Sequence, residues 1–85
     1  MADSQTAFEQ AVADSKSLPE KPDNRTLLEL YALYKQSTEG DAAGKRPGFS
    51  DLVGRAKWDA WDAKKGLSAD EAKTAYVELV ESLKE

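Results

Sequence analysis

The chain has 85 residues with 12 basic and 16 acidic side chains, a formal net charge of −4, and neither cysteine nor histidine. This length fits one domain over residues 1–85, whose small core favours a groove between elements over a large closed cavity. The composition excludes disulfides, cysteine nucleophiles and histidine-based triads, and it removes the usual zinc ligands. Extensive nucleic-acid binding is not expected either, because it depends on neutralising phosphates with excess basic side chains.

No apolar run approaches the roughly 18 residues that a membrane-spanning helix needs. Residues 1–10 are polar and acidic, unlike a signal peptide. We therefore expect a cytoplasmic protein without stable membrane insertion. The charge is uneven, since residues 41–66 hold 6 basic and 4 acidic side chains while both flanking parts are acidic. This electropositive part favours an anionic ligand, although a solvated surface of mixed charge is the simpler alternative.

Apolar residues recur with helical spacing in two segments of the first half of the chain. The first expected helix covers residues 4–15 and ends before two proline-containing pairs, at 18–19 and 21–22. The second covers residues 24–36 with Asp23 as its N-cap. Its apolar positions follow the i, i+3, i+4, i+7 pattern with two flanking leucines, and they are Leu27, Leu30, Tyr31 and Tyr34, with Leu28 and Leu33 beside them. This surface is wide enough to contact two neighbouring helices.

A long loop and two further helices are expected in the second half. The loop reaches residue 50 and contains an Arg-Pro-Gly sequence at 46–48 that favours a tight turn. The third helix is expected over residues 50–65, with Ser50 as its N-cap and Gly66 in a left-handed conformation after its end. Leu52, Ala56, Ala60 and Ala63 form a narrow stripe of mostly small residues that would allow close helix packing. The fourth covers residues 69–83 behind a capping box of Ser68 and Glu71. The pattern therefore predicts an all-α four-helix bundle.

Aromatic rings and lysines occur together on the second and third expected helices. Lys35 lies one helical turn from Tyr31, while Lys57 precedes Trp58 and Trp61. Lysine ammonium groups suit phosphate, and a tyrosine ring can stack on a purine. For any such pair alone, core packing of the rings and solvation of the lysine is the stronger interpretation. The combination with a leucine-rich helix, a long loop and the electropositive middle part of the chain instead indicates a ligand with an apolar tail and a phosphorylated head.

Catalysis has little support in the sequence. Pairs of carboxylates such as Asp59 with Asp62 fall on outward helix faces, where solvated charge is the default. The glycines match neither a phosphate-binding loop nor a dinucleotide-binding fingerprint, and no calcium-loop spacing is present. We therefore expect no enzyme activity, no catalytic residues, no cofactor and no metal.

Several segments, in this order and spacing, resemble the acyl-CoA-binding protein family. They are Leu-Tyr-Ala-Leu-Tyr-Lys-Gln at 30–36, Gly-Asp at 40–41, Arg-Pro-Gly at 46–48, Ala-Lys-Trp-Asp-Ala-Trp at 56–61, Gly-Leu-Ser at 66–68 and Ala-Tyr at 75–76. The resemblance covers nearly the whole chain, from about Phe8 to Leu83. It implies an up-down-down-up bundle and a monomeric intracellular carrier and buffer of medium- to long-chain acyl-CoA thioesters in lipid transport and fatty-acid metabolism. Transient contact with enzymes that use acyl-CoA would follow.

The resemblance also implies a ligand-binding site. In the family, adenine and the 3′-phosphate bind a polar site on helices 2 and 3, while the acyl chain lies in an apolar groove under the head group. By the family pattern, Lys35 and Lys57 contact the 3′-phosphate region and Tyr31 flanks the adenine. The head-group positions that carry over are Lys16, Tyr31, Lys35, Lys57 and Tyr76. Leu27 and Leu28 fall in the acyl groove, and Tyr34 lies inside the binding stretch.

One position departs from the family pattern. Many members have a lysine where this chain has Val53, so one phosphate contact is expected to be lost. Arg55 does not replace it, because two residues are about 200° apart around a helix. We expect weaker head-group binding and the same ligand class. Two alternatives remain at this point, namely a module that receives a partner helix on its exposed apolar residues and a small enzyme acting on CoA esters.

Overall fold

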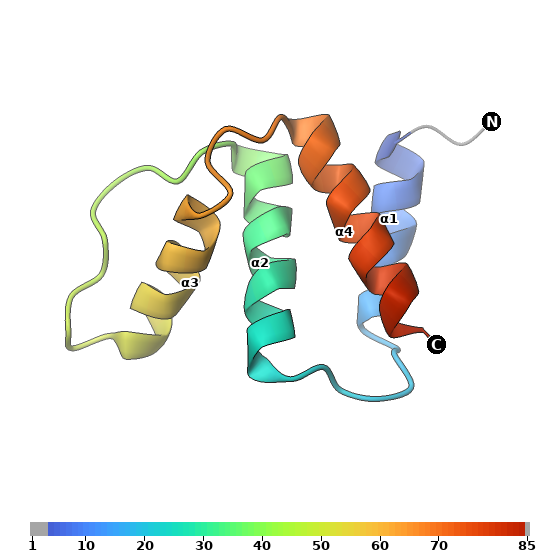
Figure 1. Cartoon of the computed structure of the whole chain (residues 1–85), viewed down its shortest axis with the longest axis horizontal. Helices are drawn as coiled ribbons and strands as arrows, with labels where there is room; N and C mark the ends of the chain where they lie inside the picture. The colour runs from blue at the N-terminus through green and yellow to red at the C-terminus, as the bar shows by residue number, and fades with distance from the viewer. Residues whose placement is uncertain (1–3, 85) are drawn as a thin grey trace.

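The computed structural model describes residues 4–84, which form four helices and contain no β-strand. They are α1 (Ser4–Ser15), α2 (Asn24–Glu39), α3 (Leu52–Asp62) and α4 (Ala69–Leu83). Figure 1 shows them in a row, in the order α3, α2, α4, α1, with α2 and α3 running in one direction and α1 and α4 in the other. This arrangement confirms the expected all-α, up-down-down-up bundle.

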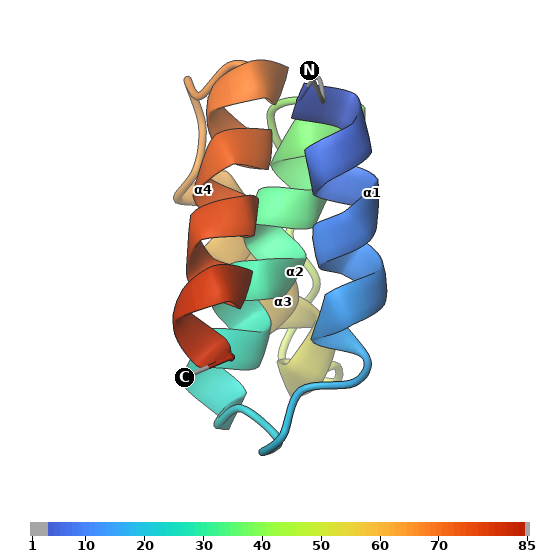
Figure 2. The same ribbon diagram turned by 90° about the vertical axis from the view of Figure 1, so that its right-hand side faces the viewer.

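The bundle is flat, with extents of 43 × 28 × 15 Å. Helix α2 packs against both α3 and α4, whereas α1 packs against α4. Seen from the side in Figure 2, α1 and α4 stand in front of α2, with α3 behind it. The wide apolar surface expected for α2 therefore has the two neighbours that its width predicts, and α3 forms one edge of the molecule.

The core lies between α1, α2 and α4. Its buried members are Phe8, Ala11, Leu30, Leu33, Tyr76 and Val80. The ring of Phe8 meets Tyr76 edge-on, with 5.2 Å between ring centroids, and stacks on Tyr34 at 5.9 Å. Edge-to-face and offset stacked pairs at such distances are the favoured aromatic geometries. Helix α3, in contrast, contributes no buried residue, so its contact with α2 is shallow.

The expected caps are confirmed at α2 and α4. The Asp23 carboxylate accepts a hydrogen bond from the Thr26 backbone N–H at 2.8 Å. Ser68 and Glu71 form the reciprocal bonds of a capping box, at 3.0 and 3.1 Å. Each bond satisfies a backbone N–H that has no partner within its helix. The N-terminal end of α2, which matters below, is therefore fixed locally.

The boundaries of α2 and α3 differ from the sequence-based expectation. Helix α2 continues to Glu39, because Gln36 and Ser37 are buried and Gly40, with φ of 81°, closes the last turn by donating to the Gln36 carbonyl. Helix α3 begins at Leu52 with Asp51 as its N-cap, so Ser50 was the wrong cap. It ends at Asp62, and residues 63–66 form tighter turns before Gly66, whose φ of 97° confirms the left-handed position.

Two further expectations for this region were wrong. The tight turn lies two residues later than the Arg-Pro-Gly sequence predicts, with residues 49 and 50 at its centre, because the Asp51 N–H donates to the Gly48 carbonyl. The stripe of small residues on α3 is not a buried packing surface, since Leu52 and Ala56 are exposed. Figure 1 shows the first half of α3 further from α2 than its second half, and both residues lie in that first half.

Polar contacts fasten the C-terminal ends of α2 and α3 to each other. The Trp61 indole N–H donates to the Gly40 carbonyl at 2.7 Å. The Asp41 carboxylate accepts hydrogen bonds from the Gly66 backbone N–H and from the side-chain amide of the buried Gln36. The same amide group also donates to the Leu67 carbonyl. These bonds hold the pKa of Asp41 below its ordinary value, the Gly66 bond having the larger effect. The two helices are thus tied at one end and diverge at the other.

Candidate functional site: a groove between α2 and α3

A groove of about 420 Å³ lies between the first halves of α2 and α3. Its lining combines five apolar side chains with one amide, one phenol and one ammonium group. The residues are Asn24, Leu27, Leu28, Tyr31, Leu52, Val53, Ala56 and Lys57. Four of the sequence-predicted site residues therefore meet here, although they come from helices separated by a long loop.

Helical spacing explains why these residues share one groove. On α2, Leu27 and Tyr31 are four residues apart, and on α3 Val53 and Lys57 are four residues apart, so each pair occupies one helix face. Because the two helices run in the same direction (Figure 1), their N-terminal halves lie beside each other. The apolar wall is open to solvent, with Leu52 and Val53 exposed by 67% and 68%. Such exposed apolar surface is typical of a binding groove.

The polar part of the groove is a cation over an aromatic ring. The Lys57 ammonium lies 5.5 Å from the centroid of the Tyr31 ring, within the range of cation–π attraction. The contact joins α3 to α2 and holds both groups next to the apolar wall. A phosphorylated ligand entering this groove would meet an ammonium group and a phenol at the same place.

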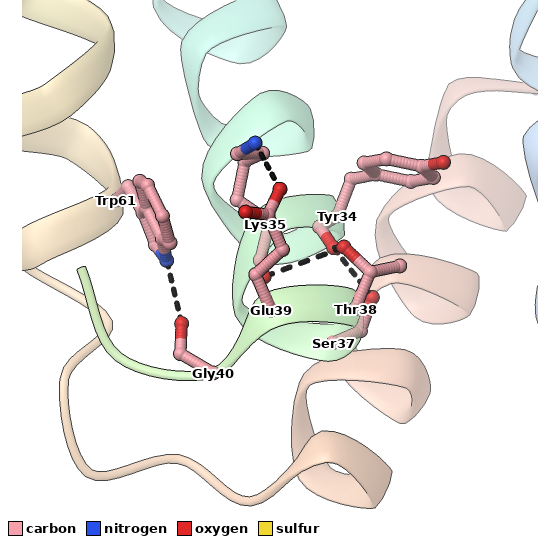
Figure 3. A network of polar contacts seen from close by, with 7 residues as sticks. All are labelled: Tyr34, Lys35, Ser37, Thr38, Glu39, Gly40 and Trp61. Atoms are coloured by element: carbon pink, nitrogen blue, oxygen red, sulfur yellow. Dashed lines mark hydrogen bonds and ion pairs between the residues drawn. The ribbon is translucent and has the colours of Figure 1, made fainter. Parts of the chain in front are cut away.

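Lys35 occupies a second cationic position, one turn further along α2 than Tyr31. Its ammonium lies 5.0 Å from the centroid of the Trp61 ring and forms an ion pair with Glu39. Figure 3 shows Lys35 and Trp61 on the same side of α2, with the Glu39 carboxylate against the ammonium. The bond to Glu39 raises the pKa of Lys35 above its ordinary value. Lys35 therefore lies beside both a carboxylate of its own helix and an aromatic ring of α3.

Tyr34 points away from this side. In Figure 3 its ring extends to the right of α2, whereas Trp61 lies to the left and Lys35 between them. It stacks on Phe8 of α1, and its backbone carbonyl accepts hydrogen bonds from the Ser37 and Thr38 hydroxyls. The structure thus gives Tyr34 a packing role between helices, and its place in a ligand site stays a prediction.

Two other predicted site residues lie outside the groove lining. Tyr76 is buried in the core, where its hydroxyl donates to the Ser15 hydroxyl at 3.3 Å. Lys16 follows the last residue of α1 and is exposed, and its backbone N–H donates to the Ala13 carbonyl. Tyr76 bonds to Ser15, and Lys16 is the next residue in the chain. Both predicted residues therefore lie at the C-terminal end of α1. Contacts of Lys16 and Tyr76 with a ligand stay predictions.

Four lining residues were absent from the predicted site, namely Asn24, Leu52, Val53 and Ala56. Leu52 and Ala56 had been assigned to helix packing, and Val53 had been noticed only as a departure from a family pattern. The available signal was the pair of apolar residues in the first turn of α3, directly after a long loop. Neighbouring residues lie about 100° apart around a helix, so such a pair widens the apolar surface beyond what contact with a single partner helix uses.

Two contacts attach the loop before α3 to α3 itself. Arg46 in the loop makes a two-fold contact with the Asp59 carboxylate of α3, at 2.7 and 2.6 Å, and this pairing lowers the pKa of Asp59. The Arg55 guanidinium stacks over the exposed Phe49 ring at 4.2 Å. Over residues 4–84, no cluster of acidic side chains suited to a metal ion is present, and no helix has the length and apolarity to cross a bilayer.

Comparison with known proteins identifies the family. Residues 5–80 match the model of the family described as acyl-CoA-binding protein. Acyl-CoA-binding protein homolog 1 of Caenorhabditis elegans is 54% identical over 77 residues, which cover 91% of this chain and 90% of that protein. A crystal structure of acyl-CoA-binding protein 2 of Oryza sativa matches with a TM-score of 0.90 and 42% identity, covering 95% of this chain and 90% of that one.

A third relative places the same unit inside a longer protein. Human enoyl-CoA delta isomerase 2 is 47% identical over 83 residues, which cover 98% of this chain and only 21% of that protein. The match therefore concerns one part of the isomerase, and it carries no inference about isomerase activity here. The family model, the relatives and the shared fold together show that this chain belongs to the acyl-CoA-binding protein family, whose members are binding proteins.

Proposed function

We propose that this chain is a reversible carrier of medium- to long-chain acyl-CoA thioesters, with its ligand in the groove between α2 and α3. The acyl chain packs on the leucines of α2 and the apolar residues that open α3. The phosphorylated head lies against Tyr31, Lys57 and Lys35. The proposal includes no catalytic step and no cofactor.

The observation that carries this proposal is the composition of one groove. Apolar side chains and a lysine–tyrosine pair line the same space of about 420 Å³. A purely anionic ligand would not need the exposed leucines and valine, and a fatty acid alone would not need a second cation at Lys35. Burying apolar surface contributes about 25 cal/mol per Å², and a hydrogen bond to a charged group contributes about 1.5–3 kcal/mol. A ligand with both parts gains from both terms.

The direction of the groove supports a fixed ligand orientation. Its apolar wall lies toward the diverging N-terminal ends of α2 and α3, where Leu27 and Leu52 are exposed. Lys57 and then Lys35 lie nearer to the C-terminal ends of α2 and α3, which the hydrogen bonds of Trp61 and Asp41 hold together. The head group would therefore bind beside the rigid end, and the acyl chain would extend along the open end.

The wider role follows from reversible binding. A monomeric cytoplasmic carrier would buffer free acyl-CoA and pass it to enzymes that use it through transient contacts. Two of the five apolar lining residues, Leu52 and Val53, are largely exposed, so the ligand can enter and leave without unfolding of the domain. Such access suits a buffer, which must release its ligand when demand rises.

Backbone amide shifts of a ¹⁵N-labelled chain during titration with palmitoyl-CoA test the location. We expect the largest shifts in the first halves of α2 and α3 and small shifts along the exposed face of α4. Large shifts confined to α4 would contradict the proposed site. Incubation with the thioester followed by detection of free thiol separates binding from hydrolysis, and steady release of CoA would contradict the non-catalytic role.

A further inference from the structure

Glu39 forms an ion pair with a lysine proposed to bind phosphate. It ends α2, four residues after Lys35, and its carboxylate contacts the Lys35 ammonium. Figure 3 shows the Glu39 carboxylate against the Lys35 ammonium, with Trp61 of α3 to the left of them. The Lys35 side chain is 23% exposed and that of Glu39 is 52% exposed. The partner of Lys35 in the free chain is thus an anion that is itself accessible to solvent and to an incoming ligand.

The chemistry of the two anions is alike. A carboxylate and a phosphate both offer oxygen acceptors with negative charge, whereas the lysine ammonium has three donors and no acceptor. The ring of Trp61, 5.0 Å from the ammonium, limits the directions from which a second anion can approach. A carboxylate that remains in place would also repel a phosphate dianion at short range.

We propose that Glu39 is an intramolecular competitor for Lys35, which the head-group phosphate of the ligand must displace. The inference rests on the proposed function and adds a device that lowers affinity and speeds release. Glu39 would occupy Lys35 in the free chain and keep its charge satisfied. It would recapture Lys35 as the ligand leaves, so the carrier would exchange its ligand faster than the groove alone allows.

The opposite role makes the opposite prediction. If Glu39 instead orients Lys35 toward the phosphate and stays bonded in the complex, then removing its charge should weaken binding. The two roles are separated by replacing Glu39 with glutamine, which keeps the size and removes the charge. The matched control is Glu29→Gln, because Glu29 is on the same helix, is 44% exposed and pairs with Lys64 at 2.5 Å. Lys64 is not among the residues that line the groove.

The experiment measures affinity for palmitoyl-CoA and for its dephospho form, which lacks the 3′-phosphate, in the parent chain and four variants. The variants are E39Q, K35A, the double variant of these two, and the control E29Q. We expect E39Q to bind palmitoyl-CoA about two- to fivefold more tightly at low salt, the scale of an exposed helical ion pair with the added loss of charge repulsion. The gain should shrink at high salt, in the K35A background, and with the dephospho ligand.

Each outcome decides between the roles. Equal gains in E39Q and E29Q would show a general effect of net charge and overturn the competition. Weaker binding by E39Q would establish the orienting role instead. A gain that persists in the K35A background would mean through-space repulsion without competition. If the parent chain and E39Q bind palmitoyl-CoA equally well, the competition is overturned and the proposed function stands. If neither chain binds palmitoyl-CoA, the proposed function itself is contradicted.

Discussion

Replacing Lys57 with alanine tests the head-group part of the site. In the free chain, the Lys57 ammonium lies over the Tyr31 ring at 5.5 Å from its centroid. An exposed cation–π contact contributes about 0.5–1 kcal/mol, so the free energy of unfolding should fall by no more than that. Loss of a hydrogen bond to a charged phosphate costs about 1.5–3 kcal/mol. Affinity for palmitoyl-CoA should therefore fall by roughly 10- to 150-fold while the fold is retained.

Arg55→Ala is the matched control for this variant. Arg55 lies on the same helix, also stacks on an aromatic ring, at 4.2 Å from Phe49, and does not line the groove. Both variants remove one positive charge and one cation–π contact. Calorimetric titration and urea unfolding of the two chains separate a local contact from a change in net charge. Equal losses of affinity in both variants, or an unchanged affinity in folded K57A, would refute the placement of phosphate at Lys57.

Three further predictions concern the groove, the core and the response to acid. Val53→Lys should tighten acyl-CoA binding by about three- to tenfold, because it adds an ammonium one turn from Lys57, and Val53→Leu should show no such gain in the same titration. Val80→Ala should lower the free energy of unfolding in urea by about 2–3 kcal/mol, since Val80 is fully buried. The free energy of unfolding should stay constant from neutral pH to about pH 5 and fall below pH 4. The reason is that hydrogen-bonded carboxylates, whose pKa is lowered in the folded state, lose these contacts when they are protonated. A thermal midpoint that is unchanged between pH 6 and pH 3 would contradict this. The carboxylates concerned are Asp14, Asp23, Asp41, Asp59 and Glu71.

The sign of the acid prediction follows from the folded state. A hydrogen bond from an N–H or an ammonium stabilises the charged carboxylate, so the folded pKa is below the unfolded one. The contribution to stability is present above the unfolded pKa and is lost as pH falls through the folded pKa. At Asp14 the principal donor is Lys84, and at Glu71 it is the Ser68 backbone N–H. Substituting Glu71 with glutamine should therefore remove part of the loss between pH 5 and pH 3.

The sequence predicted those parts of the fold that local signals control. Helical periodicity located α1 and α4, and the Asp23 cap and the Ser68 capping box marked two helix starts. The ends near the loop were predicted less well, because tertiary contacts set them. Burial of Gln36 extends α2, and the turn at 63–66 ends α3 early. No periodicity within either segment contains that information.

The candidate site divides in the same way. The pattern of aromatic rings and lysines singled out Tyr31 on one helix and Lys57 on the other, and the family resemblance added Leu27 and Leu28. Spacing did not show that Leu52 and Val53 face solvent, because that depends on how far α3 diverges from α2. Nor did it show that Tyr76 is buried with its hydroxyl on Ser15. The ion pair of Glu39 with Lys35 could have been predicted from the i, i+4 spacing. The position of Trp61 beside Lys35, which suggests competition with a ligand, is visible only in the structure.

Calorimetric titration with palmitoyl-CoA, with CoA alone and with palmitate alone tests most directly whether one groove binds head and tail together. The groove geometry predicts tight one-to-one binding of the thioester, with much weaker binding of either half. It also predicts that binding weakens as salt rises, because the ammonium groups of Lys35 and Lys57 are partly open to solvent. Equal affinity for palmitate and palmitoyl-CoA, or no heat with any of the three ligands, would contradict the account and favour a partner helix as the occupant of the groove.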